Sequence, residues 1–143
     1  MIRVRIDGLK DAIRDLKEWE QDKIRRTAMQ VERSAINIER DAKNAAPVDM
    51  GILRSSIAKT VTASDKGRVV SAEVGTSVEY APFVEFGTGS GVSVPDGQQE
   101  YAMQFKGKTG RKRNYPARPF LFPAWEKERP KFVNAMEDIL AKR

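Results

Sequence analysis

The 143-residue chain contains no cysteine and no histidine. The lack of cysteine excludes disulfides, thiolate metal sites and cysteine nucleophiles. The lack of histidine removes the side chain that titrates near neutral pH, which is also the commonest ligand of transition metals. No apolar run is long enough to span a bilayer, and the first residues alternate without the apolar core of a signal peptide. We therefore expect a protein assembled in the cytoplasm, with no metal, no cofactor and no membrane partner.

Negative charge is in the minority, because 26 Lys and Arg residues face 20 Asp and Glu residues and the net charge is +6. A basic balance favours encounter with polyanions such as nucleic acid, an acidic protein face or a lipid surface, but it does not choose among them. The hydrophobic fraction of 40% is that of a folded protein. The length predicts a single domain over residues 1–143.

The first third of the chain predicts a strand followed by a long helix. Ile2, Val4 and Ile6 alternate with arginines, which is the pattern of a half-buried strand. Neither glycine nor proline occurs in residues 9–46, so we expect a long helix that Pro47 ends and that bends or breaks near residues 19–23. Its narrow apolar stripe comprises Ile24, Ala28, Val31, Ala35, Ile38, Ala42 and Ala45.

The middle and the end of the chain predict a hairpin and a second long helix. The β-rich runs 57–61 and 68–75 flank a turn signal at residues 64–67. Asp49 is expected to cap a short turn at residues 51–56, and residues 80–87 to form another short helical turn. The last helix carries apolar side chains at helical spacing, and Pro130 is expected to interrupt or bend it.

Residues 87–117 hold six of the ten glycines, so we expect a mobile loop or an extended hairpin, with a strand at residues 101–105. A Gly-Lys-Thr triplet lies inside this segment, but the remaining pattern of a phosphate-binding loop is missing. Two interpretations stay open: a solvated loop, or a contact to DNA phosphates or to an acidic partner. The cations concerned are Lys106, Lys108, Arg111, Lys112 and Arg113.

Three short motifs carry candidate contact residues. Glu85, Phe86 and Gly87 invite a catalytic reading, which is poor without a histidine, a cysteine or a second carboxylate at a suitable spacing. We expect instead that Phe86 packs in the core and that Glu85 pairs with a cation such as Arg118. Phe120 is either a core residue or an interface anchor, because arginine and aromatic residues are enriched at interface hot spots.

The motif between Pro47 and Ser56 has the same two alternatives. Proline and glycine there predict a sharp corner between the long helix and the hairpin. The structural interpretation is that this corner only defines the fold. The functional interpretation is that Arg54 and Ser55 lie exposed and touch a neighbouring subunit.

Taken in order, the clusters at residues 46–57, 78–88 and 117–124 resemble the tail-completion, or head–tail joining, proteins of long-tailed phages, also known as neck or minor tail proteins. The resemblance implies an α+β fold in which a long N-terminal helix and a C-terminal helix pack on a curved antiparallel sheet. It also implies a structural virion protein that forms a ring, typically a hexamer. The ring lies between the head connector or adaptor proteins and the tail tube or terminator protein, and DNA passes through it. No catalytic residue is implied.

On this basis we expect a non-enzymatic protein of the head–tail junction. The expected subunit or partner contacts are Arg54, Ser55, Glu85, Phe86, Arg118 and Phe120. The alternative is a basic accessory protein that binds nucleic acid. Its weakness is that the aromatic residues gather in apolar clusters and are not interleaved with the basic run, as stacking on bases requires.

Overall fold

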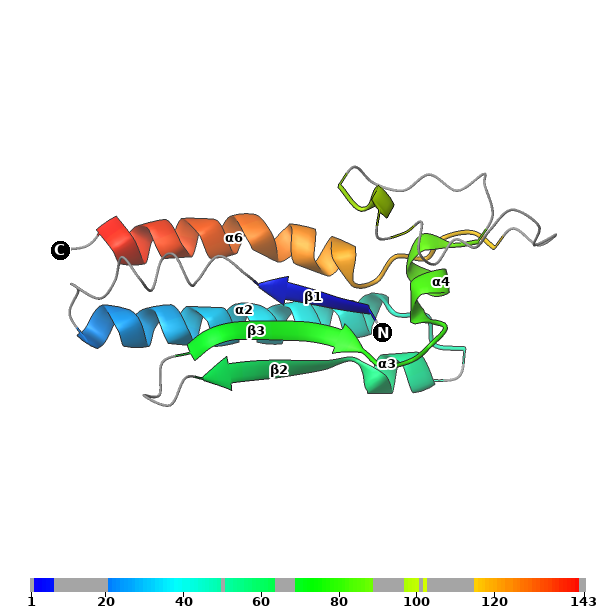
Figure 1. Ribbon diagram of the computed structural model, residues 1–143, viewed down its shortest axis with the longest axis horizontal. Coiled ribbons are helices and arrows are strands. Elements are labelled where there is room, and N and C mark those ends of the chain that lie inside the picture. Colours follow the sequence, from blue (N-terminus) through cyan, green and yellow to red (C-terminus); the bar gives the residue numbers. More distant parts are fainter. Residues whose placement is uncertain are drawn as a thin grey trace.

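The computed structural model describes residues 2–6, 21–49, 51–63, 69–88, 97–100, 102 and 115–141. Figure 1 shows their arrangement as an α+β fold with a three-stranded antiparallel sheet and long helices. In chain order the elements are β1 (Ile2–Ile6), α2 (Gln21–Ala45), α3 (Ile52–Ser56), β2 (Ala58–Ala63), β3 (Val69–Thr76), α4 (Ala81–Phe86) and α6 (Phe122–Ala141).

The sheet has the strand order β1-β3-β2, with β3 antiparallel to both neighbours. Val4 pairs with Val74 across the first ladder, and both side chains are buried. Gly75 lies directly against β1, where a Cβ atom would be 2.5 Å from the carbonyl oxygen of Ile2. The predicted strand at the start of the chain and the predicted hairpin are confirmed, although the turn at residues 64–68 lies outside the described residues.

Helix α2 occupies the centre of the molecule, in contact with the sheet and with α6. Its predicted stripe is buried from Val31 to Ala42, and the small alanines let the neighbouring elements approach closely. The stripe prediction is wrong at its end: Ala45 is exposed and Ala46, just beyond the helix, is buried instead. Residues 7–20, where the sequence predicts the start of the long helix and its bend, lie outside the described residues.

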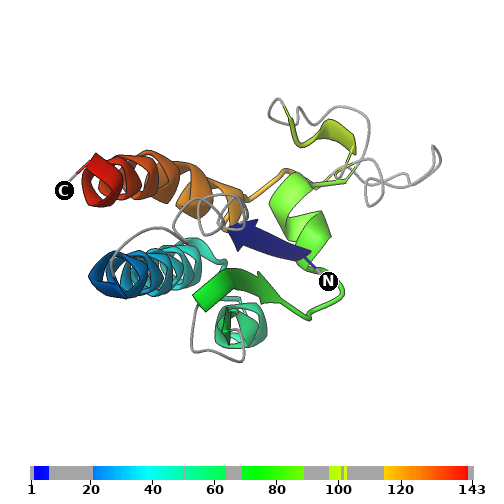
Figure 2. The same cartoon turned by 60° about the vertical axis from the view of Figure 1, so that its left-hand side comes forward.

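Helix α6 runs antiparallel to α2 and alongside it, as Figures 1 and 2 both show. Met136 and Ile139 are buried, as their helical spacing predicts. Pro130 does not interrupt this helix, which is continuous from Phe122 to Ala141. Since proline has no backbone N–H, the helix lacks one internal hydrogen bond at this position.

The corner between α2 and the hairpin is built by Pro47 and Gly51. The helix ends at Ala45, and Gly51 adopts the left-handed conformation with φ of 67° that side-chain-bearing residues avoid. The predicted cap is wrong, because Gly51 itself occupies the N-cap position of α3 and no side chain caps it. Asp49 lies 3.7 Å from the guanidinium of Arg118 instead.

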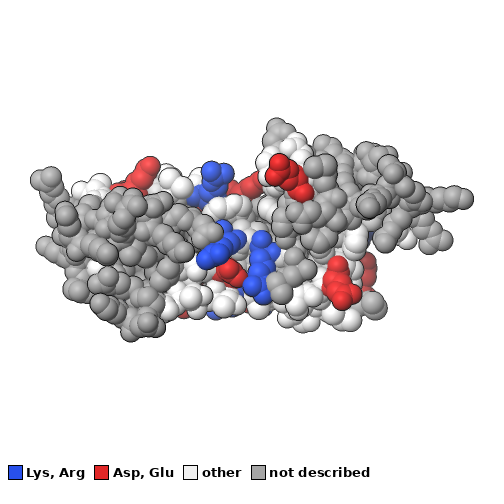
Figure 3. Space-filling model, in the orientation of Figure 1, with Lys and Arg blue, Asp and Glu red and all other residues white. Residues whose placement is uncertain are grey.

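The sheet face that points away from α2 is polar. Glu73 accepts a hydrogen bond from Arg3 at 3.2 Å and lies 3.6 Å from Arg5. Figure 3 shows basic and acidic side chains next to one another at the middle of this view. Glu73 therefore balances part of the positive charge of the two arginines on this face.

Candidate functional site

Helix α4 carries the most constrained polar side chain of the described chain, Glu85. The glutamate is only 2% exposed, and its carboxylate accepts three backbone hydrogen bonds. The donors are the N–H groups of Phe120 at 2.8 Å, Leu121 at 2.9 Å and Phe122 at 3.0 Å. These groups lie at the start of α6, where the first N–H groups of a helix have no partner inside it. Glu85 therefore caps α6 from a distant part of the chain.

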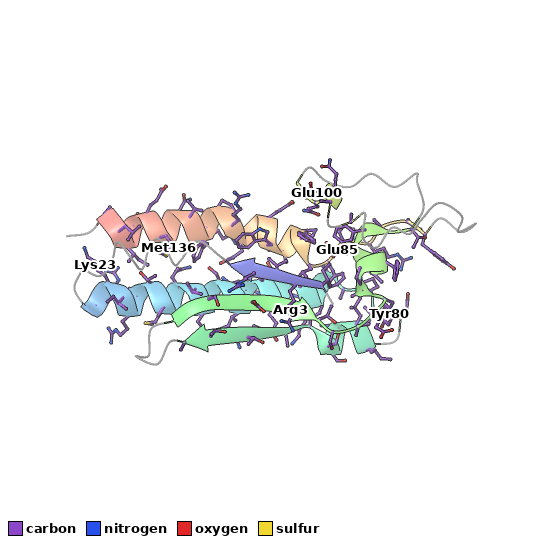
Figure 4. The ribbon with its side chains drawn as sticks, viewed as in Figure 1. Arg3, Lys23, Tyr80, Glu85, Glu100 and Met136 are labelled. Atoms are coloured by element: carbon purple, nitrogen blue, oxygen red, sulfur yellow. The ribbon has the colours of Figure 1, made fainter. Side chains whose placement is uncertain are left out.

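The carboxylate also meets the positive end of the α6 dipole. Figure 4 shows Glu85 beside the beginning of this helix. Burial raises the pKa of the Glu85 carboxyl above its ordinary value of 4.5, the three N–H donors act in the opposite direction, and nearby Glu126 adds to the increase. Desolvation therefore outweighs the effect of the three N–H donors on this pKa.

Gly87 and Thr88 continue this attachment. Gly87 has φ of 70°, and a Cβ atom there would lie 2.6 Å from the carbonyl oxygen of Tyr115 and 2.8 Å from the nitrogen of Ala117. Thr88 donates its N–H to the Tyr115 carbonyl, and its hydroxyl oxygen accepts the Tyr115 N–H, both at 3.0 Å. The backbone N–H of Arg118 donates to the Val84 carbonyl at 2.8 Å.

We call this set of contacts the clamp; it comprises residues 84–88 and 115–122. It joins the two ends of the segment 89–114, which includes the basic run. The five cations of that run, Lys106 to Arg113, lie outside the described residues. Of the strand predicted at residues 101–105, the structure describes only Ala102, and this residue is helical.

The clamp is also apolar on its inner side. Phe86 is buried with its ring centroid 5.5 Å from that of Phe122, and Phe120 is completely buried. This is the core position that the sequence offered as one of two alternatives for Phe120. A contact of Glu85, Phe86 or Phe120 with a neighbouring subunit stays a prediction.

The predicted pair of Glu85 with Arg118 is wrong. The side chain of Arg118 is 63% exposed and approaches Asp49, whereas Glu85 is buried on backbone donors. The sequence pattern missed this arrangement because a carboxylate that caps a helix from 35 positions away leaves no local spacing signal.

Arg54 and Ser55 are exposed on α3, as expected for a corner. The Ser55 hydroxyl donates to the Ile52 carbonyl at 3.0 Å, so part of its capacity is used within the helix. Contact of either residue with a neighbour stays a prediction.

Four large apolar side chains, which the sequence analysis did not identify, are each between 40% and 65% exposed and belong to the clamp or to the segments around α3 and α4. We call them the end surface: Val48, Ile52, Tyr80 and Tyr115. Figure 4 shows Tyr80 at the end of the molecule occupied by α3 and α4. The ion pair of Asp49 with Arg118 connects the segment that carries Tyr115 to the corner that carries Val48 and Ile52.

Within the described ranges, no three Asp and Glu side chains are grouped so that they could hold a metal ion. None of the helices described is long and apolar enough to cross a membrane. The geometry assembles a structural attachment and an exposed apolar surface.

Comparison with known families identifies one match. The model of the HK97-gp10-like family, described as "Bacteriophage HK97-gp10, putative tail-component", matches residues 6–87. The match runs from the end of β1 through Gly87, and so includes α2, the hairpin and the Glu85 side of the clamp. No curated protein and no solved structure gives a significant match. Because the match covers more than half of the chain, the protein belongs to the HK97-gp10-like family of phage tail components, which are structural proteins of the virion.

Proposed function

We propose that this tail component acts at the head–tail joint of a long-tailed phage. Copies of the chain form a ring, typically sixfold, that completes the tail or neck. The ring lies between the head connector or adaptor proteins and the tail tube or terminator protein, and genomic DNA passes through its centre. Membership of a tail-component family is the observation that carries this proposal. The order of the clusters at residues 46–57, 78–88 and 117–124 supports the joint rather than another part of the tail.

The role that we propose is structural and not enzymatic. Glu85 is the most conspicuous carboxylate of the motifs, and both of its oxygens accept backbone N–H groups. A general acid or base must reach the proton that it transfers, and this carboxylate is enclosed by its donors. The clamp is suited to fixing the path of the chain between α4 and α6.

An early stop codon in this gene of the parent phage, followed by electron microscopy of the lysate, tests the proposal. Filled heads beside separate tails are the expected result, and purified protein added to that lysate should restore infectivity. Joined, intact particles would overturn the assignment to the joint. The wild-type gene supplied from a plasmid controls for effects on neighbouring genes.

The excess of basic residues favours a second candidate, a nucleic-acid-binding accessory protein. Five cations lie within residues 106–113. If they contact phosphates, replacing all five by glutamine should abolish most of the affinity for duplex DNA and flatten its salt dependence. The matched control replaces the exposed α6 cations Arg129 and Lys131 in the same way. Equal DNA binding by both variants would remove this candidate.

A further inference from the structure

The large apolar side chains that the described residues expose include those of the end surface and Met29. Met29 lines a groove of about 420 Å³ between α2 and α6, which we call the helix groove. It is lined by Arg26, Met29, Gln30, Arg33, Ala135, Asp138 and Ile139. Figure 4 shows Tyr80 near α3 and α4, and Lys23 at the start of α2 towards the other end of the long axis, so Tyr80 is separated along the molecule from the first half of α2, which carries the groove residues Arg26 to Arg33.

The helix groove combines the apolar side chains Met29, Ala135 and Ile139 with two arginines, Arg26 and Arg33. Met29 is 61% exposed, so its apolar side chain is accessible to a partner. Arg26 and Arg33 form no ion pair with any other residue that the structure describes. The groove therefore offers an apolar contact beside positive charge.

The end surface and its neighbour Glu79 offer an apolar side chain and a negative charge that match the groove. Tyr80 is 40% exposed, and the neighbouring Glu79 is exposed and forms no ion pair within the described ranges. A tyrosine supplies a large rigid apolar body with a polar tip, which is why it is enriched at interfaces. In the groove, Asp138 provides an acceptor for the tyrosine hydroxyl, and the two arginines provide partners for the glutamate.

We propose that Glu79 and Tyr80 of one copy dock in the helix groove of the next copy of this chain. The contact joins two different surfaces, so each copy donates one and accepts one. Such a head-to-tail contact generates a closed ring when the rotation between copies closes. This inference rests on the proposed ring and names the surfaces that hold it together.

The absence of native cysteine allows a direct test. The chain with both Ser77→Cys and Met29→Cys, which keeps Glu79 and Tyr80, is oxidised at the highest soluble concentration and separated under non-reducing, denaturing conditions. Both positions are exposed, so the changes leave the core intact. The expected result is a ladder of species beyond the dimer. Each single variant can form dimers at most, and is the matched control. A double variant that gives no more than these dimers would overturn the proposal.

Charge reversal provides an independent test on the same cross-link. Added to the double-cysteine chain, Glu79→Arg or Arg33→Glu alone should lower the yield of the ladder about tenfold or more, because like charges then meet at the contact. The two reversals together should restore most of the yield. Arg129→Glu, on α6 but not in the groove, is the control and should leave the yield unchanged. Failure of the paired reversal to restore the ladder would show that these side chains do not meet.

The two proposals fail in different ways. If the stop-codon lysate contains separate heads and tails but the ladder is absent, the joint function holds and this docking mode is wrong. If joined particles form without the protein but the ladder is present, the docking holds and the joint function is wrong.

Discussion

Two contacts of α6 differ in how they are made. At its first residues, the helix is attached to α4 by one buried carboxylate that accepts three backbone N–H groups. Along its length, it is attached to α2 by side chains: Glu128 accepts from Ser34 and Asn37, and Lys127 pairs with Asp41. The first contact fixes the course of the backbone, whereas the second joins side chains that can adjust.

This difference predicts different sensitivity to mutation. A buried backbone donor that loses its acceptor cannot turn to another partner, so the clamp should tolerate few changes. The pair of Asp41 with Lys127, whose side chain is 60% exposed, can exchange its partner for water at small cost, whereas Glu128 is buried and depends on its two side-chain donors. We therefore expect the free energy of unfolding to depend most on the clamp, less on Glu128 and least on the pair of Asp41 with Lys127.

The largest expected effect is that of Phe120→Ala. The ring of Phe120 is completely buried next to the clamp, and its loss leaves a cavity. Such large-to-small changes in a core cost about 3–5 kcal/mol. Chemical denaturation of the purified chain should show this loss. Tyr115→Ala, in the same segment but 55% exposed, is the control. An unchanged unfolding midpoint together with failed assembly would show that Phe120 acts as an interface anchor instead.

Glu85→Gln should lower the free energy of unfolding by roughly 2–3 kcal/mol. The NH₂ group of glutamine is a donor, so where it replaces an oxygen, a backbone N–H such as that of Phe122 loses its acceptor. Glu126→Gln, on an exposed residue beside it, is the matched control. If the two variants unfold at the same denaturant concentration, the clamp does not depend on this carboxylate.

The same variant tests the titration of Glu85. Its pKa is raised in the folded chain, so folding favours the protonated form. The corresponding stability is fully present below pH 4.5 and is lost as the pH rises through the raised pKa. Denaturation of the wild type across this range should show a decline that Glu85→Gln lacks. Parallel curves would contradict the direction of the shift.

The elements that were predictable from sequence are those with a local period. The alternation of Ile2 and Val4 predicts β1, and the spacing of Val31, Ala35 and Ile38 predicts the buried face of α2. Pro47 and Gly51 predict the corner after α2, because the backbone conformations that these two residues favour depend on the residues themselves. The resemblance to a phage family is confirmed at the level of the family, by a match that covers the first cluster and nearly all of the second, whereas the third, at residues 117–124, lies outside the matched residues.

The clamp could not be predicted, because its contacts join residues that are far apart in the chain and lack a period. The sequence predicts a pair of Glu85 with Arg118 because their motifs flank the same loop, yet the buried carboxylate of Glu85 accepts three backbone N–H groups and Arg118 approaches Asp49. Ser34 lies next to the alanine-rich stripe, and its burial could not be predicted because its hydroxyl donates to Glu128 on the distant helix α6, besides accepting from Gln30.

Glu128→Gln should have an intermediate effect of about 1 kcal/mol, since the side chain keeps its acceptor oxygen for Ser34 and Asn37 but loses the charge that strengthens both hydrogen bonds. Thermal unfolding measures the difference. Glu137→Gln, exposed on the same helix, is the control. A loss as large as that of Glu85→Gln would remove the distinction between the two contacts of α6.

The smallest effect is expected for Asp41→Asn. Asp41 lies 2.7 Å from Lys127, whose side chain is 60% exposed, and solvent screening limits such a pair to about 0–1 kcal/mol. The hydrogen bond with Lys127 lowers the pKa of Asp41 below 3.8, so its contribution is present above that pH and is lost as the pH falls through the lowered pKa.

The wild type and Asp41→Asn should therefore differ slightly at neutral pH and converge in acid, in a titration monitored by chemical denaturation. Glu85→Gln should show the opposite trend, with its largest difference from the wild type in acid. The two carboxylates that contact α6 thus respond to pH with opposite sign, because Glu85 is buried among backbone donors and Asp41 pairs with an exposed lysine. The same trend in both variants would mean that the two carboxylates experience similar surroundings.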